Sequence, residues 1–427
     1  MPLLIVGGGA AGLLAAIAAG RSGRPAVLLE RNRRVGARLL LSGGGRCNLT
    51  HMGDADHLVR AFGRRGRFLY GAFSRFGSDD IRALLAAEGV PTKADEEGRV
   101  FPADDRARSV VRALERAARR VGTAIVLGVR VVSVDRVARD RGLVVTASDG
   151  RRWRSDRVIL ATGGASYPAV GTTGDGYRWL RALGHTIEPL RPALVPLETE
   201  ETWPARVQGV ALRGVEVSVY AGDRVGARRC GDVLFTHFGL SGPAVLDVSH
   251  EAVVALGVRR EDGGTRGAAA GPTDCGRVVL GIRLDPEAAP EAWRERLDAS
   301  IRESPRRLIK NVLGSWWPQS LAEVLCAEAG VDPDTQAGQV PREARERLAA
   351  QLSELRLSVK GARPLVEATV TAGGVSLREV DPRTMASRLV PGLHITGELL
   401  DVDGPTGGYN LQAAFSTGWV AGTAAAA

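Results

Sequence analysis

The sequence is poor in cysteine and contains no long uninterrupted apolar run. Its four cysteines, Cys47, Cys230, Cys275 and Cys326, are widely separated and form no C-x-x-C pair. This spacing disfavours a zinc site, a disulfide framework and a redox cysteine pair, so we expect no metal and a reducing, cytoplasmic environment. No stretch approaches about 18 consecutive apolar residues, which predicts no membrane span, and the apolar start lacks the basic region of a signal peptide.

Lysine is also scarce, although the chain is basic. Only Lys93, Lys310 and Lys360 are lysines among the 57 basic residues, and the formal net charge is +9. A basic chain raises the question of nucleic-acid binding. The arginines are spread along the chain beside acidic residues, as GC-rich coding produces, and no recognition motif accompanies them. We therefore expect a small-molecule substrate rather than a nucleic acid, and the composition leaves the oligomeric state open.

The glycines near the N-terminus follow a dinucleotide-binding pattern. The apolar run 3–6 predicts a buried strand, and an alanine-rich helix is predicted to follow the turn. Gly7, Gly9 and Gly12 have the G-x-G-x-x-G spacing. In this pattern Gly7 makes the tight turn, Gly9 lets a pyrophosphate approach the backbone, and Gly12 lets the helix pack closely on the strand. Ala11, between Gly9 and Gly12, is also expected to contact the cofactor. The alternative is a tight turn that binds no ligand.

The second predicted strand ends on an acid. Glu30 follows the apolar run 26–29, at the distance where an acid binds a ribose hydroxyl. A glycine-rich segment then covers 35–50, where Gly45 and Asn48 are expected to lie against the ligand. Arg38 and Arg46 are expected to neutralise a pyrophosphate or a substrate carboxylate. The alternative for this segment is a flexible surface loop.

Two later segments are predicted to return to the cofactor. Strand-like runs at 124–134, 143–147 and 153–160 predict a small meander, which leads into Ala161 and Gly163 as a second approach to the cofactor. Near the C-terminus a helix is predicted to begin around 408–411, so backbone N–H groups at Asn410 and Leu411 would face an anion. Only one dinucleotide fingerprint is present. This favours non-covalent FAD as the resident cofactor, with NAD(P)H as a transient visitor.

Several blocks resemble one bacterial flavoprotein family. They are LLLSGGGRCNLT (39–50), TGGASYPAVGTTGDGY (162–177), LFTHFGLSGPAVL (234–246), VTAGGV (370–375) and GELLDVDGPTGGYNLQAAFSTGWVAG (397–422). In this order they resemble the BaiN-like NAD(P)/FAD-dependent oxidoreductases, which include enzymes described as aminoacetone oxidases. The resemblance implies that the backbone of Val131 meets the adenine. It also implies that the strand end at Gly397 and Glu398 holds the ribityl chain.

The expected fold is α/β, with a glutathione-reductase-type FAD Rossmann domain. We expect a discontinuous FAD domain at 1–190 and 361–427, an inserted β-rich substrate domain at 191–285 and a helical subdomain at 286–360. Three domains are also what the resemblance implies.

The expected function is hydride transfer between the flavin and a small organic substrate or NAD(P)H. Alternatives are an amine oxidase that uses oxygen, a reductase of activated carbon–carbon double bonds and an RNA-associated flavoprotein. Arg46 is a candidate anion anchor, and His237 and Tyr409 are candidate proton donors or acceptors. A packed structural role for His237 is equally open.

Overall fold

A computed structural model describes residues 1–137, 142–222, 224–257 and 277–427 of the protein. The chain forms two compact units, one made of Met1–Arg191 with Leu365–Ala427 and the other of Pro192–Pro364. Both ends of the chain therefore belong to the first unit, while the second unit is an insertion.

The first unit is built on a five-stranded parallel sheet. Its strand order is β19 (Leu393–Ile395), β10 (Val158–Leu160), β1 (Leu3–Val6), β2 (Ala26–Glu30), β6 (Ala124–Leu127). Parallel strands that are covered on both faces read as continuous apolar runs, and all four residues of β1 are buried. Because β1 is the central strand, the N-terminal glycine turn leaves the sheet at the middle of its carboxyl edge. Open α/β sheets bind their ligands at this edge.

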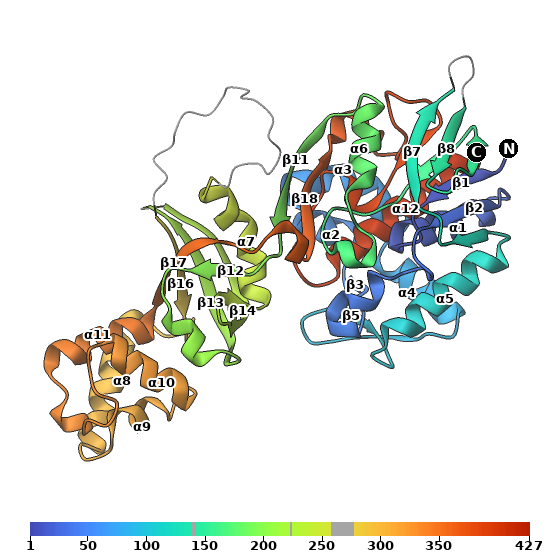
Figure 1. Ribbon diagram of the computed structural model, residues 1–427. Helices are drawn as coiled ribbons and strands as arrows, with labels where there is room; N and C mark the ends of the chain where they lie inside the picture. The colour runs from blue at the N-terminus through green and yellow to red at the C-terminus, as the bar shows by residue number, and fades with distance from the viewer. Residues whose placement is uncertain (138–141, 223, 258–276) are drawn as a thin grey trace. The chain divides into compact units, whose positions relative to one another are not determined.

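The first and last helices of the chain pack against each other. Helix α1 (Ala10–Arg21) contacts α12 (Tyr409–Ala426), which Figure 1 shows in red beside the blue N-terminal strands. Side chains at Gly418 and Gly422 would collide with the backbone of Ala11 and Ala15, so these glycines permit the close approach. The two termini thus build one continuous region.

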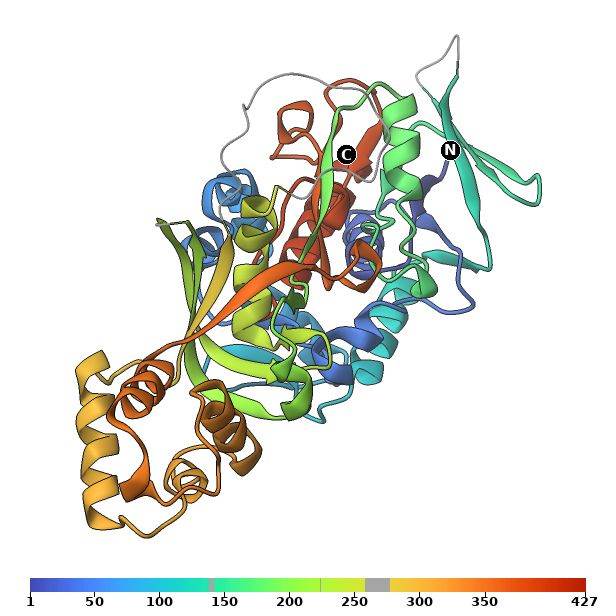
Figure 2. The same ribbon diagram turned by 60° about the vertical axis from the view of Figure 1, so that its left-hand side comes forward.

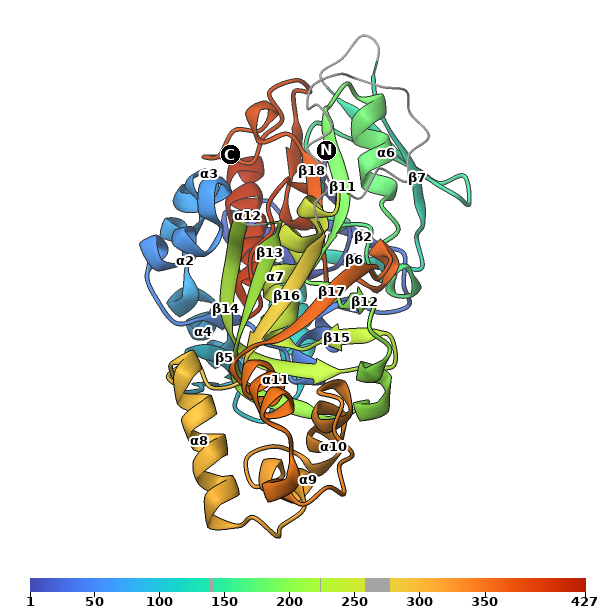
Figure 3. The same ribbon diagram turned by 90° about the vertical axis from the view of Figure 1, so that its left-hand side faces the viewer.

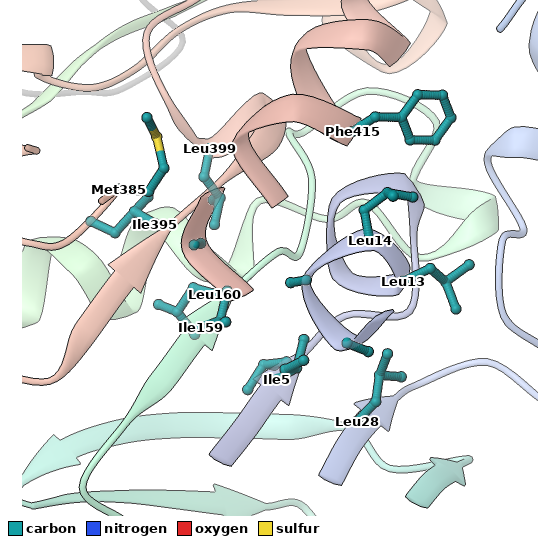
Figure 4. Packing of buried hydrophobic residues seen from close by; sticks show 14 of the residues in the cluster. Ile5, Leu13, Leu14, Leu28, Ile159, Leu160, Met385, Ile395, Leu399 and Phe415 are labelled. Carbon is teal, nitrogen blue, oxygen red and sulfur yellow. The ribbon is translucent and has the colours of Figure 1, made fainter. Parts of the chain in front are cut away.

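The core of this unit lies between the sheet and these helices. Figure 4 shows Ile5 and Leu28 on neighbouring strands below the helix that carries Leu13 and Leu14. All four side chains are fully buried, and Phe415 of α12 belongs to the same cluster. Burial of a large aliphatic side chain contributes about 1.5–3 kcal/mol, so this cluster fixes the helix that follows the glycine turn.

Further helices and three small sheets complete the unit, the third being the meander that follows β6. The helices are α2 (Ala55–Ala61), α3 (Gly63–Arg75), α4 (Ser78–Ala87), α5 (Ala107–Arg120) and α6 (Asp175–Ala182). One small sheet has the order β3 (Thr50–His51), β5 (Arg99–Pro102), β4 (Thr92–Ala94), and another pairs β11 (Ile187–Ala193) with β18 (Val370–Val375).

The predicted meander is wrong in part. Two of the strand-like runs each contain two strands, because β6 and β10 belong to the parallel sheet. The meander consists of β7 (Val131–Arg136), β8 (Leu143–Ala147) and β9 (Arg152–Ser155). Gly128, with φ of +71°, turns the chain between β6 and β7. An apolar run that continues through such a turn does not reveal the change of sheet.

The second unit contains a closed barrel. Its strands follow the order β12 (Leu197–Thr199), β15 (Gly239–Ser241), β14 (Arg224–Phe235), β13 (Ala211–Ala221), β16 (Val278–Arg283), β17 (Leu355–Ala362). Helix α7 (Pro243–Ala255) lies among these strands in Figure 3, and its buried side chains join the barrel core.

Four helices follow within the same unit. They are α8 (Pro290–Glu303), α9 (Ile309–Leu313), α10 (Gln319–Glu328) and α11 (Arg342–Ser353), drawn together in gold and orange in Figure 2. Their apolar side chains share one buried cluster with the barrel. A separate helical subdomain at 286–360 therefore stays a prediction.

The architecture confirms the expected mixed α/β fold with a parallel Rossmann-type sheet and a β-rich insertion. Within the described ranges, none of the helices combines the length and the apolar character needed to cross a bilayer.

Candidate cofactor site

The three glycines of the N-terminal turn have three different surroundings. Gly7 has φ of +105°, and a side chain there would collide with the backbone of Ala161. A side chain at Gly12 would collide with the Gly7 carbonyl, so this glycine lets the helix approach the strand. At Gly9, in contrast, no atom lies within 4 Å of the position that a Cβ would take. The space beside Gly9 is what a pyrophosphate requires.

Helix α1 starts at this open space. Gly9 is its N-cap and supplies no side-chain hydrogen bond, so the first-turn N–H groups near Ala10 and Ala11 have no capping side chain. The helix start also carries the positive end of the helix dipole. Together, the open glycine and the uncapped N–H groups fit the pyrophosphate of a dinucleotide.

Glu30 organises the neighbouring strand end. Its carboxylate is buried and accepts hydrogen bonds from the backbone N–H groups of Gly8 at 2.7 Å and Asn32 at 2.8 Å. A carboxylate has further acceptor sites, so a ribose hydroxyl can still bind. The backbone N–H of Val129 donates to the Glu30 carbonyl at 2.9 Å, which brings the start of β7, at Val131, towards Glu30. The structure thus brings the expected ribose and adenine residues close together.

Two distant chain segments meet this turn. The backbone N–H of Ala161 donates to the Val6 carbonyl at 2.9 Å, and Gly163 follows with φ of +74°. From the C-terminal part, Gly397 comes so close to α1 that a Cβ there would lie 3.1 Å from the Cβ of Ala11. Residues of three separate segments, all expected to bind the cofactor, therefore lie around one turn.

Glu398 and Arg38 connect these segments. The Glu398 carboxylate accepts from the backbone N–H groups of Gly164 at 3.2 Å and Thr371 at 2.8 Å. The Arg38 Nη1 atom lies 3.5 Å from Glu398 Oε2 and donates to the Ser166 carbonyl at 3.2 Å. Both side chains hold protein groups in place. Contact of Glu398 with the ribityl chain and of Arg38 with a phosphate stay predictions.

The second glycine-rich loop has a backbone that only glycine adopts readily. Gly43, Gly44 and Gly45 all have positive φ, and no atom lies within 4 Å of a Cβ position at Gly44. Asn48 joins this loop to α12: with its amide assigned from its neighbours, the side-chain oxygen accepts from the Gly408 N–H at 3.2 Å and the nitrogen donates to the Thr50 carbonyl at 3.3 Å. The loop is therefore fastened to the start of the last helix.

The side chains at the end of this loop differ in accessibility. Arg46 is exposed, and its guanidinium lies over the Phe101 ring at 4.5 Å. In the described part of the chain it makes no ion pair with a carboxylate, so its charge is available for an anion. Burial raises the pKa of the neighbouring Cys47 thiol to about 11, so this residue is not a thiolate nucleophile at neutral pH.

The start of α12 is the expected anion-binding end. Its N-cap, Gly408, has φ of +94° and supplies no side-chain hydrogen bond. The Asn410 side chain accepts from the Gly404 N–H at 2.9 Å and donates to the Gly404 carbonyl at 2.8 Å. Its amide therefore fixes the preceding loop, while Leu411 is half-buried in the first turn. The backbone N–H groups at this end still carry the positive dipole that the sequence predicts.

Two histidines that no sequence pattern indicates lie next to Tyr409. The rings of His51 and Tyr409 stack at 4.8 Å, those of His51 and His57 at 5.1 Å, and His57 Nε2 lies 3.1 Å from the Tyr409 hydroxyl. They come from β3, α2 and α12, so no local pattern links them. His237 belongs to the second unit, where it is exposed and packs edge-on against Phe238 at 4.9 Å.

Comparison with known proteins identifies the family of the chain. The model of the family described as "HI0933-like protein Rossmann domain" matches residues 1–424. The chain is 34% identical to a 3-dehydro-bile acid delta(4,6)-reductase of Clostridium scindens over 99% of this chain and 98% of that protein. It is 30% identical to a ribosomal RNA dihydrouridine synthase of Escherichia coli over 97% of this chain and 96% of that protein.

A solved structure has the same fold. A 3-ketosteroid delta1-dehydrogenase from Sterolibacterium denitrificans aligns over 99% of both chains, with a TM-score of 0.53 and 13% sequence identity. The expected resemblance and the enzyme class, an FAD-dependent oxidoreductase, are confirmed. From its N-terminal glycine turn to its last helix, the chain belongs to the HI0933-like family.

Proposed function

We propose that the protein reduces an activated carbon–carbon double bond, conjugated with a carbonyl group, and that NAD(P)H is the electron donor. The observation that carries this proposal is a chemical step shared by two relatives with different substrates. A bile acid delta(4,6)-reductase and a dihydrouridine synthase are both named for adding two hydrogens to a double bond. In a 3-keto steroid skeleton and in uracil alike, that bond is conjugated with a carbonyl.

The residues of the first unit suit the cofactor that this chemistry needs. FAD, when bound, supplies hydride transfer. The open backbone at Gly9, the carboxylate of Glu30 and the start of α12 would hold its pyrophosphate, its ribose and the pyrimidine side of its ring, respectively. A positive helix end beside the pyrimidine favours the reduced, anionic form of the ring, which is the hydride donor.

Rapid anaerobic mixing tests the proposal. NADPH should bleach the flavin absorbance band of the FAD-loaded protein, and a conjugated enone of the steroid class should restore it without oxygen. A protein that NADPH does not reduce, or that only oxygen re-oxidises, would refute the proposal. If aminoacetone instead reduces the flavin, and hydrogen peroxide forms when oxygen re-oxidises it, the amine oxidase alternative is established.

A second candidate substrate is a uracil base in RNA, and the charge distribution favours it. The first unit, 1–191 and 365–427, contains 35 arginines and lysines against 24 acidic residues, whereas 192–364 contains 22 against 24. The basic excess of the chain therefore belongs to the unit with the cofactor residues. Such an excess attracts a phosphate backbone. This uneven distribution of charge, which the net charge of the whole chain does not show, supports RNA as the second candidate.

A structured ribosomal RNA transcript separates the two substrates. If RNA is the substrate, the transcript should bind at low salt, lose affinity steeply as salt rises, and gain the mass of two hydrogens per modified uridine with NADPH. A transcript that neither binds nor changes mass, together with turnover of the enone, would assign the small-molecule substrate.

A further inference from the structure

The rings of His51, His57 and Tyr409 form a cluster at the start of α12. Each ring comes from a different element, and the two histidines are half-buried while Tyr409 is 9% exposed. The stacking is nearly parallel, with interplanar angles of 13° between His51 and Tyr409 and 22° between His51 and His57. A polar contact also joins two of the rings, because His57 Nε2 lies 3.1 Å from the Tyr409 hydroxyl.

The backbone around the cluster is shaped to admit these rings. A Cβ at Gly53 would lie 2.7 Å from the His57 ring, and a Cβ at Gly98 would lie 2.7 Å from the His51 ring. Both glycines also have positive φ, which other residues rarely adopt. Each histidine therefore occupies space that a glycine provides.

The backbone of His57 is held in the first turn of α2, and its ring has a lowered pKa. Asp54 is the N-cap of α2, and its carboxylate accepts from the backbone N–H of His57 at 2.8 Å. Burial, followed by the nearby charges of His51 and Arg60, lowers the pKa of His57, with Asp54 opposing the shift. At neutral pH the His57 ring is therefore neutral, so one ring nitrogen can donate while the other accepts.

The cluster lies at the start of α12, which the proposed function assigns to the pyrimidine side of the flavin ring. Asn48 connects the glycine-rich loop to the N–H of Gly408, directly before Tyr409. Reduction of a conjugated double bond needs a hydride at one carbon and a proton at the other. The cofactor supplies only the hydride, so a side chain or water must supply the proton.

We propose that Tyr409 is the proton donor of this reaction and that His57 is the positioning residue that reprotonates it. The inference rests on the proposed function. The Tyr409 O–H bond breaks as its proton joins the substrate carbon next to the carbonyl, while the hydride, which originates from NAD(P)H, joins the other carbon of the double bond. His57 gives its Nε2 proton to the Tyr409 oxygen as its Nδ1 takes a proton from solvent, so the ring stays neutral and solvent supplies the net proton that the reduction consumes.

Half-reactions measured on the FAD-loaded protein test the pair. Tyr409→Phe should slow re-oxidation by the enone about 100-fold or more, which is the scale of general acid catalysis. His57→Phe keeps an aromatic ring in the stack and should slow this step less, by about tenfold, because the proton donor itself is still present. Bleaching by NADPH reports whether each variant is folded and loaded. Tyr70→Phe, at a tyrosine that is 49% exposed on α3, is the matched control and should behave as wild type.

Two readouts separate a proton relay from a packing role. Imidazole added to His57→Ala should restore re-oxidation, and the solvent deuterium isotope effect on this step should increase in His57→Phe. Wild-type re-oxidation in Tyr409→Phe or His57→Phe would overturn the inference, as would a His57→Ala defect that imidazole does not relieve.

A third readout does not depend on turnover. In NMR titrations of the loaded protein, Tyr409→Phe should shift the titration of His57, whereas Tyr70→Phe should not. A His57 titration unchanged by Tyr409→Phe would overturn the pair. If instead the wild-type protein fails to react with the enone, the proposed function fails, while this titration still decides whether the two groups interact.

Discussion

Replacement of Gly9 by alanine separates cofactor binding from folding. No atom lies within 4 Å of the Cβ position at Gly9, and its φ of −82° and ψ of −164° are accessible to alanine. Alanine should therefore leave the apoprotein as stable as wild type, or more stable by about 0.4–1 kcal/mol, because it restricts the unfolded chain. The methyl group would instead occupy the space that the pyrophosphate needs.

The expected loss of FAD affinity follows from the backbone contacts. A charge-assisted hydrogen bond from an N–H group to a phosphate contributes about 1.5–3 kcal/mol. Loss of one such bond corresponds to an increase of about 10- to 150-fold in Kd. Calorimetric titration of the apoprotein with FAD measures this change, and urea denaturation measures stability.

Gly361→Ala is the matched control. Gly361 lies in β17 of the second unit, has no left-handed φ and also has no atom within 4 Å of its Cβ position. It should change neither FAD affinity nor, by more than about 1 kcal/mol, stability. Wild-type FAD affinity in Gly9→Ala would refute the assignment of this turn to the pyrophosphate. A Gly9→Ala protein that fails to fold would contradict the open space at this residue.

Three further results are expected. Gly418→Val should destabilise the protein by about 1–3 kcal/mol or more in urea denaturation, since its side chain would collide with α1; a wild-type midpoint would contradict this packing. In the native protein, iodoacetamide near neutral pH should label the exposed Cys230 and spare the buried Cys47, whose pKa is raised to about 11; rapid labelling of Cys47, detected by mass spectrometry, would contradict its burial. Burial lowers the pKa of His394 to about 4, so the unfolded state binds a proton that the folded state rejects as pH falls below about 6.5. The free energy of unfolding should fall by about 3 kcal/mol from this group between neutral pH and pH 4, and His394→Gln should remove that part of the decrease.

Short sequence patterns predict those parts of the candidate site that lie within one continuous segment of the chain. The roles of Gly7, Gly9 and Gly12 follow from strand, turn and helix in sequence, and the structure gives each glycine the surroundings that its role requires. The strand end at Glu30 is similar, because the position of an acid at the end of the second strand can be found from the apolar run before it. These predictions needed no long-range contact.

Features that depend on long-range contacts were not predictable in the same way. The residues of β6 and β10 resemble the meander strands beside them, and only pairing with β2 and with β1, respectively, assigns them to the parallel sheet. The cluster of His51, His57 and Tyr409 brings together residues more than 350 positions apart, in contacts that no spacing rule contains. Closure of the barrel likewise depends on β12 pairing with β17.

A single anaerobic turnover tests the central claim most directly. Protein reduced stoichiometrically with NADPH is mixed with a conjugated steroid enone in the absence of oxygen, and the product is analysed by mass spectrometry. We predict one product per flavin that carries two additional hydrogens, formed as the flavin absorbance returns. Return of the absorbance without such a product, or no return until oxygen is admitted, would contradict the assignment of this chain as a reductase of conjugated double bonds.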